Sequence, residues 1–169
     1  PAELIKKVYH YREITGSSMD PMAAWLMVRS LKTLVLRVQR QNENALAIAR
    51  WLSEQPQVEA VNYPGLESHL HHDVAARQMR GYGGMLSFSL RGGFAAVKRV
   101  LPRLRLAHLA ANLGAVETLA GVPATTSHVE CTVEERAAMG IPEGLVRYSV
   151  GIEDVGDLIA DLDQAFAVA

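Results

Sequence analysis

A long run of helical periodicity limits what this chain can fold into more than any other feature of its sequence. The run opens at Asp20-Pro21. An aspartate there can accept hydrogen bonds from the free amides of a helix N-terminus, and a proline at the first helical position loses none. No glycine or proline follows until Pro56. Apolar residues recur at steps of three and four, at Trp25, Met27, Val28, Leu31, Leu34, Val35, Val38, Leu46 and Ile48.

This periodicity predicts one long helix from Pro21 to about Ser53. Such a length exceeds that of the usual globular helix. We therefore expect the helix either to bend or break near the polar stretch Gln41 to Asn44, or to cross between two domains.

Shorter elements follow in an irregular order. Strands are expected at Val58–Tyr63, Met85–Leu90, Glu117–Ala120 and Leu145–Val150, and helices at His72–Met79, Phe94–Leu101, Val133–Met139 and Asp154–Ala167. Short strands mixed with helices, without a regular strand–helix repeat, favour an α+β domain with a mostly antiparallel sheet.

Charge, cysteine content and hydropathy exclude several classes of protein. Seventeen basic and eighteen acidic residues leave a formal net charge of -1, so no overall field attracts nucleic acid or an anionic membrane. The single cysteine, Cys131, excludes an internal disulfide and a multi-cysteine zinc site, and it agrees with a reducing cytoplasm. No stretch approaches the roughly 20 apolar residues that span a bilayer. The chain opens Pro-Ala-Glu-Leu without an initiator methionine or a signal core, which we interpret as a piece of something longer.

Arg147 is the most unusual residue of the predicted strands. It lies inside the apolar run Leu145 to Val150, and strand alternation puts Leu145, Arg147 and Ser149 on one face. An arginine there points into a cleft, toward a partner or into solvent. A guanidinium is a natural clamp for a carboxylate because its planar fork donates two parallel bonds. The alternative from spacing alone is an arginine on an edge strand that faces water.

Three other clusters could suggest sites. They are the histidines His69, His71 and His72 beside Glu67 and Asp73, the glycine turns Gly81–Gly84 and Gly92–Gly93, and the basic residues Arg99, Arg103 and Arg105. The histidine spacing converges poorly on a metal, and the glycines match no phosphate-binding fingerprint. The basic residues lack the interleaved aromatics of a nucleic-acid surface. We expect a surface loop, ordinary turns and a solvated face, with no metal site.

Six blocks of sequence, in order along the chain, resemble one known family. The blocks are Arg29–Leu34, Tyr63–Leu66 with Ser68-His69, Gly83–Met85 with Ser87-Phe88, Leu113-Gly114 with Glu117–Leu119, Pro123-Ala124 with Ser127-His128, and Arg147–Asp154. Together they make nearly the whole chain similar to the carboxy-terminal third of the cystathionine γ-synthase, cystathionine γ-lyase and methionine γ-lyase family, the trans-sulfuration enzymes that depend on pyridoxal phosphate.

The resemblance implies a fold and a role for particular residues. It implies the small carboxy-terminal domain of the aspartate-aminotransferase-like fold, with residues 1–20 as the connecting segment from a pyridoxal-phosphate domain, 21–55 as an interdomain helix and 56–169 as the α+β domain. Arg147 matches the arginine that grips the substrate α-carboxylate. Asn112 and Leu113 match a loop beside the same carboxylate. Asn112 departs from the family's usual serine, and Ala115 and Ser30 stand where the family tends to have glycine.

The resemblance also implies that the cofactor pyridoxal 5'-phosphate belongs to the complete enzyme and not to this chain alone. The lysine that forms the aldimine falls before Pro1 in the family, and neither Lys6 nor Lys7 has its sequence context. No catalytic residue is therefore expected in this chain. By itself the chain is expected to be inactive, because the cofactor supplies the electron sink.

The expected function is that of a substrate-carboxylate-binding domain in a carbon–sulfur lyase or a cystathionine γ-synthase-type enzyme. The expected partners are a sulfur-containing amino acid, an upstream cofactor domain and further copies of the chain in a homo-oligomer. Neither the substrate nor the choice between β- and γ-chemistry follows from these residues. The alternative is a non-catalytic module used for dimerisation or protein interaction.

Overall fold

The long helix predicted from Pro21 to Ser53 is in fact two helices. The computed structural model describes residues 1–169, and α2 (Pro21–Leu31) is separated from α3 (Leu34–Ser53) by a turn at Lys32-Thr33. In the turn, the Lys32 and Thr33 amides each bond three residues back, to Arg29 and Ser30. The Thr33 hydroxyl donates to the same Ser30 carbonyl at 3.3 Å. Such side-chain bonds compete with the helical pattern. Because the helix ends at Leu31 and a new one begins at Leu34, the prediction of a single helix and the prediction of a break near Gln41 are both wrong.

The predicted start of α2 is confirmed. Asp20 Oδ1 accepts hydrogen bonds from the Met22 amide at 2.9 Å and from the Ala23 amide at 3.2 Å, with Pro21 at the first helical position. The preceding segment, expected only as a connection, contains a further helix, α1 (Ala2–Thr15), which ends at Gly16 in the left-handed conformation. None of the helices combines the length and the apolar character that crossing a membrane requires.

The chain divides into two compact units, residues 1–35 and 36–169. Neither α1 nor α2, in the first unit, has a buried residue. The second unit contains a five-stranded sheet in the order β1-β2-β5-β4-β3. The strands are β1 (Val58–Asn62), β2 (Met85–Leu90), β3 (His108–Leu109), β4 (Leu119–Gly121) and β5 (Leu145–Ser149). Its remaining helices are α4 (His72–Gln78), α5 (Gly93–Val100), α6 (Val133–Ala138) and α7 (Val155–Phe166).

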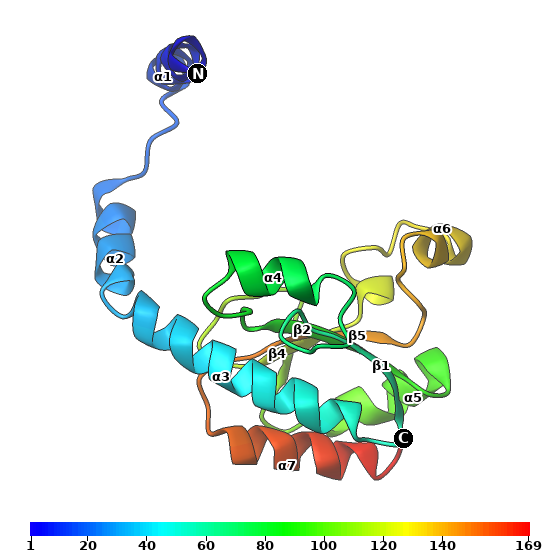
Figure 1. Cartoon of the computed structure of the whole chain (residues 1–169). Coiled ribbons are helices and arrows are strands. Elements are labelled where there is room, and N and C mark those ends of the chain that lie inside the picture. The colour runs from blue at the N-terminus through cyan, green and yellow to red at the C-terminus, as the bar shows by residue number, and fades with distance from the viewer. The chain divides into compact units, whose positions relative to one another are not determined.

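The sheet confirms the α+β prediction. Only β3 and β4 run parallel, and every other pair of neighbours is antiparallel. Strands β1, β2 and β5 lie where the sequence placed them, whereas β3, only two residues long, was not predicted. Figure 1 shows α3 and α7 along one face of the sheet, where the rings of Trp51 and Phe166 stack with their centroids 5.7 Å apart.

The two faces of strand β5 have different surroundings. Val146 and Tyr148 are fully buried in the core with Phe88 and Phe166, so this face is apolar. Burial raises the pKa of the Tyr148 hydroxyl well above its ordinary value, and the nearby Asp161 and Glu153 raise it further. The phenol therefore stays protonated. The other face of β5 carries Arg147.

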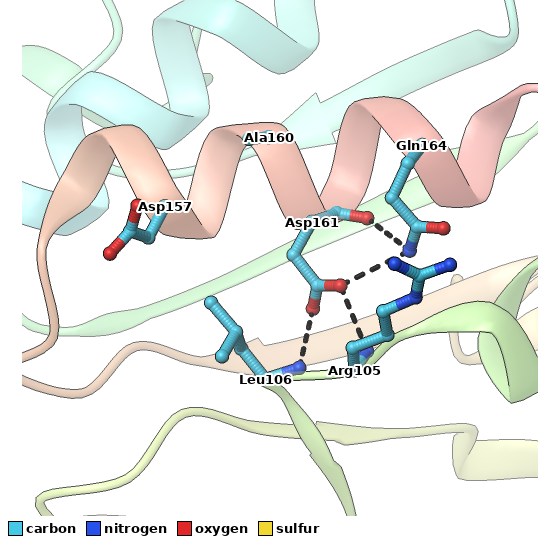
Figure 2. Close-up of a pocket in the computed structure, with 6 residues that line it drawn as sticks. All are labelled: Arg105, Leu106, Asp157, Ala160, Asp161 and Gln164. Carbon is cyan, nitrogen blue, oxygen red and sulfur yellow. Dashed lines mark hydrogen bonds between the residues drawn. The ribbon is translucent and has the colours of Figure 1, made fainter.

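A buried aspartate holds the chain as it enters β3. Asp161, on α7, accepts hydrogen bonds from three successive amides. Figure 2 shows those of Arg105 at 2.8 Å and Leu106 at 2.9 Å, and the third is that of Ala107 at 3.3 Å. Gln164 donates to the Asp161 carboxylate at 3.1 Å and to the Arg103 carbonyl at 2.6 Å. A carboxylate that accepts several backbone bonds is satisfied without a counter-ion, so Asp161 sets where the chain enters β3.

We expect Asp161→Asn to lower the free energy of unfolding by about 1–3 kcal/mol, because an amide group cannot accept all three backbone bonds and turns a donor toward them. The measurement is urea-induced unfolding. Asp163→Asn, at an exposed position of the same helix, is the matched control and should change stability by less than about 0.5 kcal/mol. Equal effects of the two substitutions would contradict the role given to Asp161.

Candidate carboxylate-binding site

Arg147 lies on the central strand of the sheet. Strand β5 pairs with β2 on one side and with β4 on the other, and Arg147 is opposite Ser87 and Gly121. The alternative of an arginine on an edge strand that faces water is therefore wrong. Arg147 is half-buried, so its guanidinium is held at a defined place on the face of the sheet opposite to Tyr148.

The guanidinium contacts a loop that connects β3 to β4. Arg147 Nη2 donates to the Asn112 carbonyl at 2.8 Å and to the Ala110 carbonyl at 3.4 Å. Arg147 Nε is buried and makes no hydrogen bond to the protein. Arg147 also forms no salt bridge within the chain, in contrast to Arg40 with Asp154 and Arg136 with Glu143.

Arg136, a buried arginine, shows how a structural arginine is bound in this protein. Arg136 donates to Glu143 Oε1 through Nε at 3.0 Å and through Nη2 at 2.7 Å, and it also bonds the carbonyls of His128 and Cys131. Its charge is thus paired inside the chain. Arg147 carries the same charge without a carboxylate partner. Because a desolvated guanidinium is best satisfied by an anion, Arg147 is suited to bind a carboxylate from outside the chain.

The loop of residues 110–116, here called the 110–116 loop, lies close against the sheet beside Arg147. A Cβ at Gly121 would be 2.9 Å from the Ala110 carbonyl oxygen and 3.4 Å from Arg147 Nη2, so a larger residue would push the loop away. The Gly114 amide donates to the Ser149 hydroxyl at 3.2 Å. The turn also needs glycine at 114, where φ is +79°.

Of the two loop residues that the resemblance singled out, Asn112 contacts the guanidinium, and Leu113 follows it in the loop. The Asn112 carbonyl binds Arg147, and the Asn112 side-chain oxygen accepts the Leu113 amide at 2.8 Å. Both residues are exposed. The Arg147 guanidinium is a donor that a carboxylate could use, and the Leu113 amide is a second donor within the 110–116 loop.

A buried network that sequence reasoning missed fixes the far end of the loop. Glu153 accepts the Thr118 amide through Oε1 at 2.6 Å and the Thr118 hydroxyl through Oε2 at 2.9 Å. The Thr118 hydroxyl in turn accepts the Gly151 amide at 2.9 Å. No spacing pattern signals this network, because Thr118 and Glu153 lie 35 residues apart.

The polar stretch Gln41 to Asn44 of α3 contacts the 110–116 loop, the turn before β2 and the residues that follow β5. Gln41 Nε2 donates to the Ala115 carbonyl at 2.9 Å, and Asn42 accepts the Gly83 amide. Asn44 is buried and donates to the carbonyls of Gly151 at 3.2 Å and Glu153 at 2.9 Å. Three of the four residues that suggested a helix break, Gln41, Asn42 and Asn44, thus bind backbone groups of other segments.

The remaining clusters have local structural partners. No group of three or more histidine, cysteine or acidic side chains is arranged to hold a metal ion. His72 Nδ1 bonds the Pro64 carbonyl at 2.8 Å, and His69 Nδ1 accepts the His71 amide at 3.2 Å. Arg99 donates to the Val168 carbonyl at 3.0 Å. These contacts account for the histidines and for one of the basic residues.

The residues of this chain do not by themselves fit pyridoxal phosphate. Its four lysines, Lys6, Lys7, Lys32 and Lys98, are all exposed. A lysine that forms a Schiff base is activated by a desolvating pocket or by neighbouring charges. The Gly81–Gly84 turn is already engaged with α3 and cannot cradle a phosphate through the Gly83 amide, which binds Asn42.

Comparison with known proteins identifies the family. The model of the Cys/Met metabolism PLP-dependent enzymes matches residues 2–167. The chain belongs to this family. It is 46% identical over 153 residues to an L-methionine gamma-lyase of Fusobacterium nucleatum subsp. polymorphum. The matched region covers 90% of this chain and 39% of that relative. It is 50% identical over 150 residues to a cystathionine gamma-synthase of Mycobacterium leprae, covering 89% of the chain and 38% of the relative.

A solved structure of the same family has the same fold. The crystal structure of cystathionine gamma synthase from Xanthomonas oryzae pv. oryzae in complex with cystathionine superimposes with a TM-score of 0.93 at 42% identity, covering 99% of this chain and 43% of that one. The expected fold, part of the PLP-dependent transferase type, is confirmed. The chain thus spans about two fifths of the length of these relatives.

The buried Arg136 and the half-buried Arg147 should respond differently to truncation. We expect Arg136→Ala to lower the free energy of unfolding by about 1–3 kcal/mol, because it removes the partner of Glu143 and a donor to each of two carbonyls. Arg147→Ala should cost no more than about 1 kcal/mol, since its charge has no partner in the chain and only loop carbonyls lose a bond. Urea unfolding of both variants tests this. A loss at Arg147 as large as that at Arg136 would make Arg147 a structural residue.

Proposed function

We propose that this chain is the carboxy-terminal, substrate-carboxylate-binding domain of a PLP-dependent carbon–sulfur lyase or cystathionine γ-synthase-type enzyme of sulfur amino-acid metabolism. The observation that carries the proposal is the half-buried guanidinium of Arg147, which has no carboxylate partner in the chain and lies beside the 110–116 loop. Membership of the family supports the class of reaction.

Arg147 binds the α-carboxylate of the amino acid and so orients the rest of the substrate. A guanidinium–carboxylate contact is directional because two N–H groups face two oxygens. The loop is adjacent to this contact, where the Leu113 amide can exchange the Asn112 side-chain oxygen for a substrate oxygen. Asn112 is exposed, so its side chain can move away without losing buried contacts. Arg147, Asn112 and Leu113 together form the proposed substrate contacts.

The names of the relatives support a four-carbon amino acid with a substituent on its γ-carbon. They include methionine gamma-lyases, a cystathionine gamma-synthase, a cystathionine gamma-lyase, and sulfhydrylases of O-acetyl-L-homoserine and O-succinylhomoserine. All of these substrates carry an α-carboxylate, which is the group that Arg147 is placed to bind. We propose a sulfur-containing amino acid as the substrate or the product.

In this proposal the pyridoxal phosphate and its lysine come from outside the 169 residues. The exposure of all four lysines supports this division. An upstream cofactor domain, further copies of the chain in a homo-oligomer and a cytoplasmic location belong to the same proposal. The chain itself then contributes recognition and orientation of the substrate, and the cofactor domain contributes the chemistry.

The isolated 169-residue chain should bind no pyridoxal phosphate specifically. The physical reason is that each of its amines is exposed to water and has no pocket that would favour an aldimine. The measurement is the absorbance of the aldimine band after incubation with the cofactor, followed by borohydride reduction and peptide mapping. A single lysine of this chain labelled in stoichiometric yield would refute the division proposed here.

In the complete protein, Arg147→Ala should lower kcat/KM for amino-acid substrates by about two to three orders of magnitude, because a charge-assisted bidentate contact is lost in a site shielded from water. Arg147→Lys should recover only part of this loss, since a point charge on a flexible stem does not reproduce the planar fork. The measurement is kcat/KM for L-cystathionine, L-methionine and L-cysteine, with aldimine absorbance reporting cofactor occupancy.

The matched control is Arg105→Ala. It removes an exposed side chain and keeps the Arg105 backbone amide, which is the group that binds Asp161 before β3. Its kinetic constants should equal those of the unmodified protein. If Arg147→Ala keeps the same kcat/KM as this control on every substrate that is turned over, the carboxylate-clamp assignment fails.

A further inference from the structure

Gln41 is the side chain of α3 that binds the 110–116 loop. Its Nε2 donates to the Ala115 carbonyl at 2.9 Å across 74 residues of sequence. Gln41 is half-buried, and its stem packs against Gly84, where an added Cβ would lie 3.0 Å from Gln41 Cβ. The side chain is therefore confined, and the amide has a fixed position from which to hold the loop.

The neighbouring residues of α3 prevent Gln41 from moving independently of the site. Asn42 accepts the Gly83 amide, and Asn44 donates to the carbonyls of Gly151 and Glu153 just after β5. The Gly84 carbonyl accepts the Val150 amide at 2.7 Å. The surface of α3 around Gln41 is thus tied to the residues just before β2 and to those just after β5, the strand that carries Arg147.

Different groups hold the two halves of the 110–116 loop. Residues 110 and 112 are held by Arg147 itself, which is the group that must also bind substrate. Residues 114, 115 and 116 are held by the Ser149 hydroxyl, by Gln41 and by the Ile152 amide. Among the three contacts of residues 114–116, only the one from Gln41 comes from outside β5 and the segment that follows it; at the other end of the loop, the Ala110 amide also donates to the Ala120 carbonyl of β4 at 3.0 Å.

We propose that Gln41 is a positioning residue that sets the distance between the 110–116 loop and Arg147. Gln41 touches neither Arg147 nor the backbone at Asn112 and Leu113, so it acts through the Ala115 carbonyl alone. The inference rests on the proposed function, since it gives the loop its role beside the substrate carboxylate. A loop held at Ala115 presents the Leu113 amide to the carboxylate without an ordering cost at each binding event.

The test uses Gln41→Glu in the complete protein with its cofactor bound. The substitution keeps the length of the side chain but removes the donor and places a carboxylate against the Ala115 carbonyl. The loss of one partly buried hydrogen bond should raise KM for the amino-acid substrate about three- to ten-fold. The kcat should stay within about two-fold, because a contact made equally in the ground state and the transition state changes KM alone.

Two further variants separate positioning from general stability. Gln41→Lys restores a donor toward the Ala115 carbonyl and should recover most of the loss in KM. Gln39→Glu adds the same charge at an exposed position of α3 that does not contact the loop, and it should leave KM unchanged. Amide hydrogen exchange of residues 113–116 should be faster in Gln41→Glu than in Gln39→Glu, and saturating substrate should slow it again.

The outcomes distinguish this inference from the proposed function. Raised KM in Gln41→Glu, with melting temperature and aldimine absorbance unchanged and rescue by lysine, supports the inference. An unchanged KM overturns it, and so does a lowered melting temperature without faster exchange in the loop. If Gln41→Glu has no effect while Arg147→Ala abolishes substrate use, only the positioning role fails. If Arg147→Ala also has no effect, the proposed function fails.

Discussion

Strand β5 is hydrogen-bonded on both sides, to β2 and to β4, and both the core and the site depend on this pairing. Because side chains alternate along a strand, one face of β5 places Val146 and Tyr148 in the apolar core with Phe88. The other face holds Arg147 and Ser149 under the 110–116 loop. The burial of one face thereby fixes the register and with it the place of the guanidinium on the other.

The site is built from backbone groups that side chains far apart in sequence hold in place. Asp161 binds three amides at the entry to β3, and Glu153 with Thr118 holds the end of the loop that leads into β4. A desolvated amide or carbonyl without a partner costs about 1–3 kcal/mol, so these polar side chains leave the loop few alternatives. The arrangement leaves the positive charge of Arg147 beside the loop without a carboxylate partner in the chain, which suits a carboxylate from outside.

Many of the helices and strands followed from local patterns. Asp20-Pro21 marked a helix start because the capping chemistry is contained in adjacent residues, and alternation located β2 and β5 within a residue at each end. The helix break at Lys32-Thr33 was missed because it replaces only a few backbone bonds and needs no glycine or proline. Strand β3 was missed because two residues carry no periodicity; its place depends on pairing with β4 and on Asp161.

The sequence by itself determined the family, through six blocks in order along the chain, and singled out Arg147 as an arginine on an apolar strand. It could not decide whether that strand lies at the edge or in the centre of the sheet, because strand order depends on contacts between segments 26 to 60 residues apart, as in the pairing of Gly121 and Ser87 with Arg147. Only the tertiary structure showed that Arg136 is paired by Glu143 whereas Arg147 has no carboxylate partner. Only the tertiary structure placed Gln41 against Ala115, since a hydrogen bond between distant segments has no local signature in the chain.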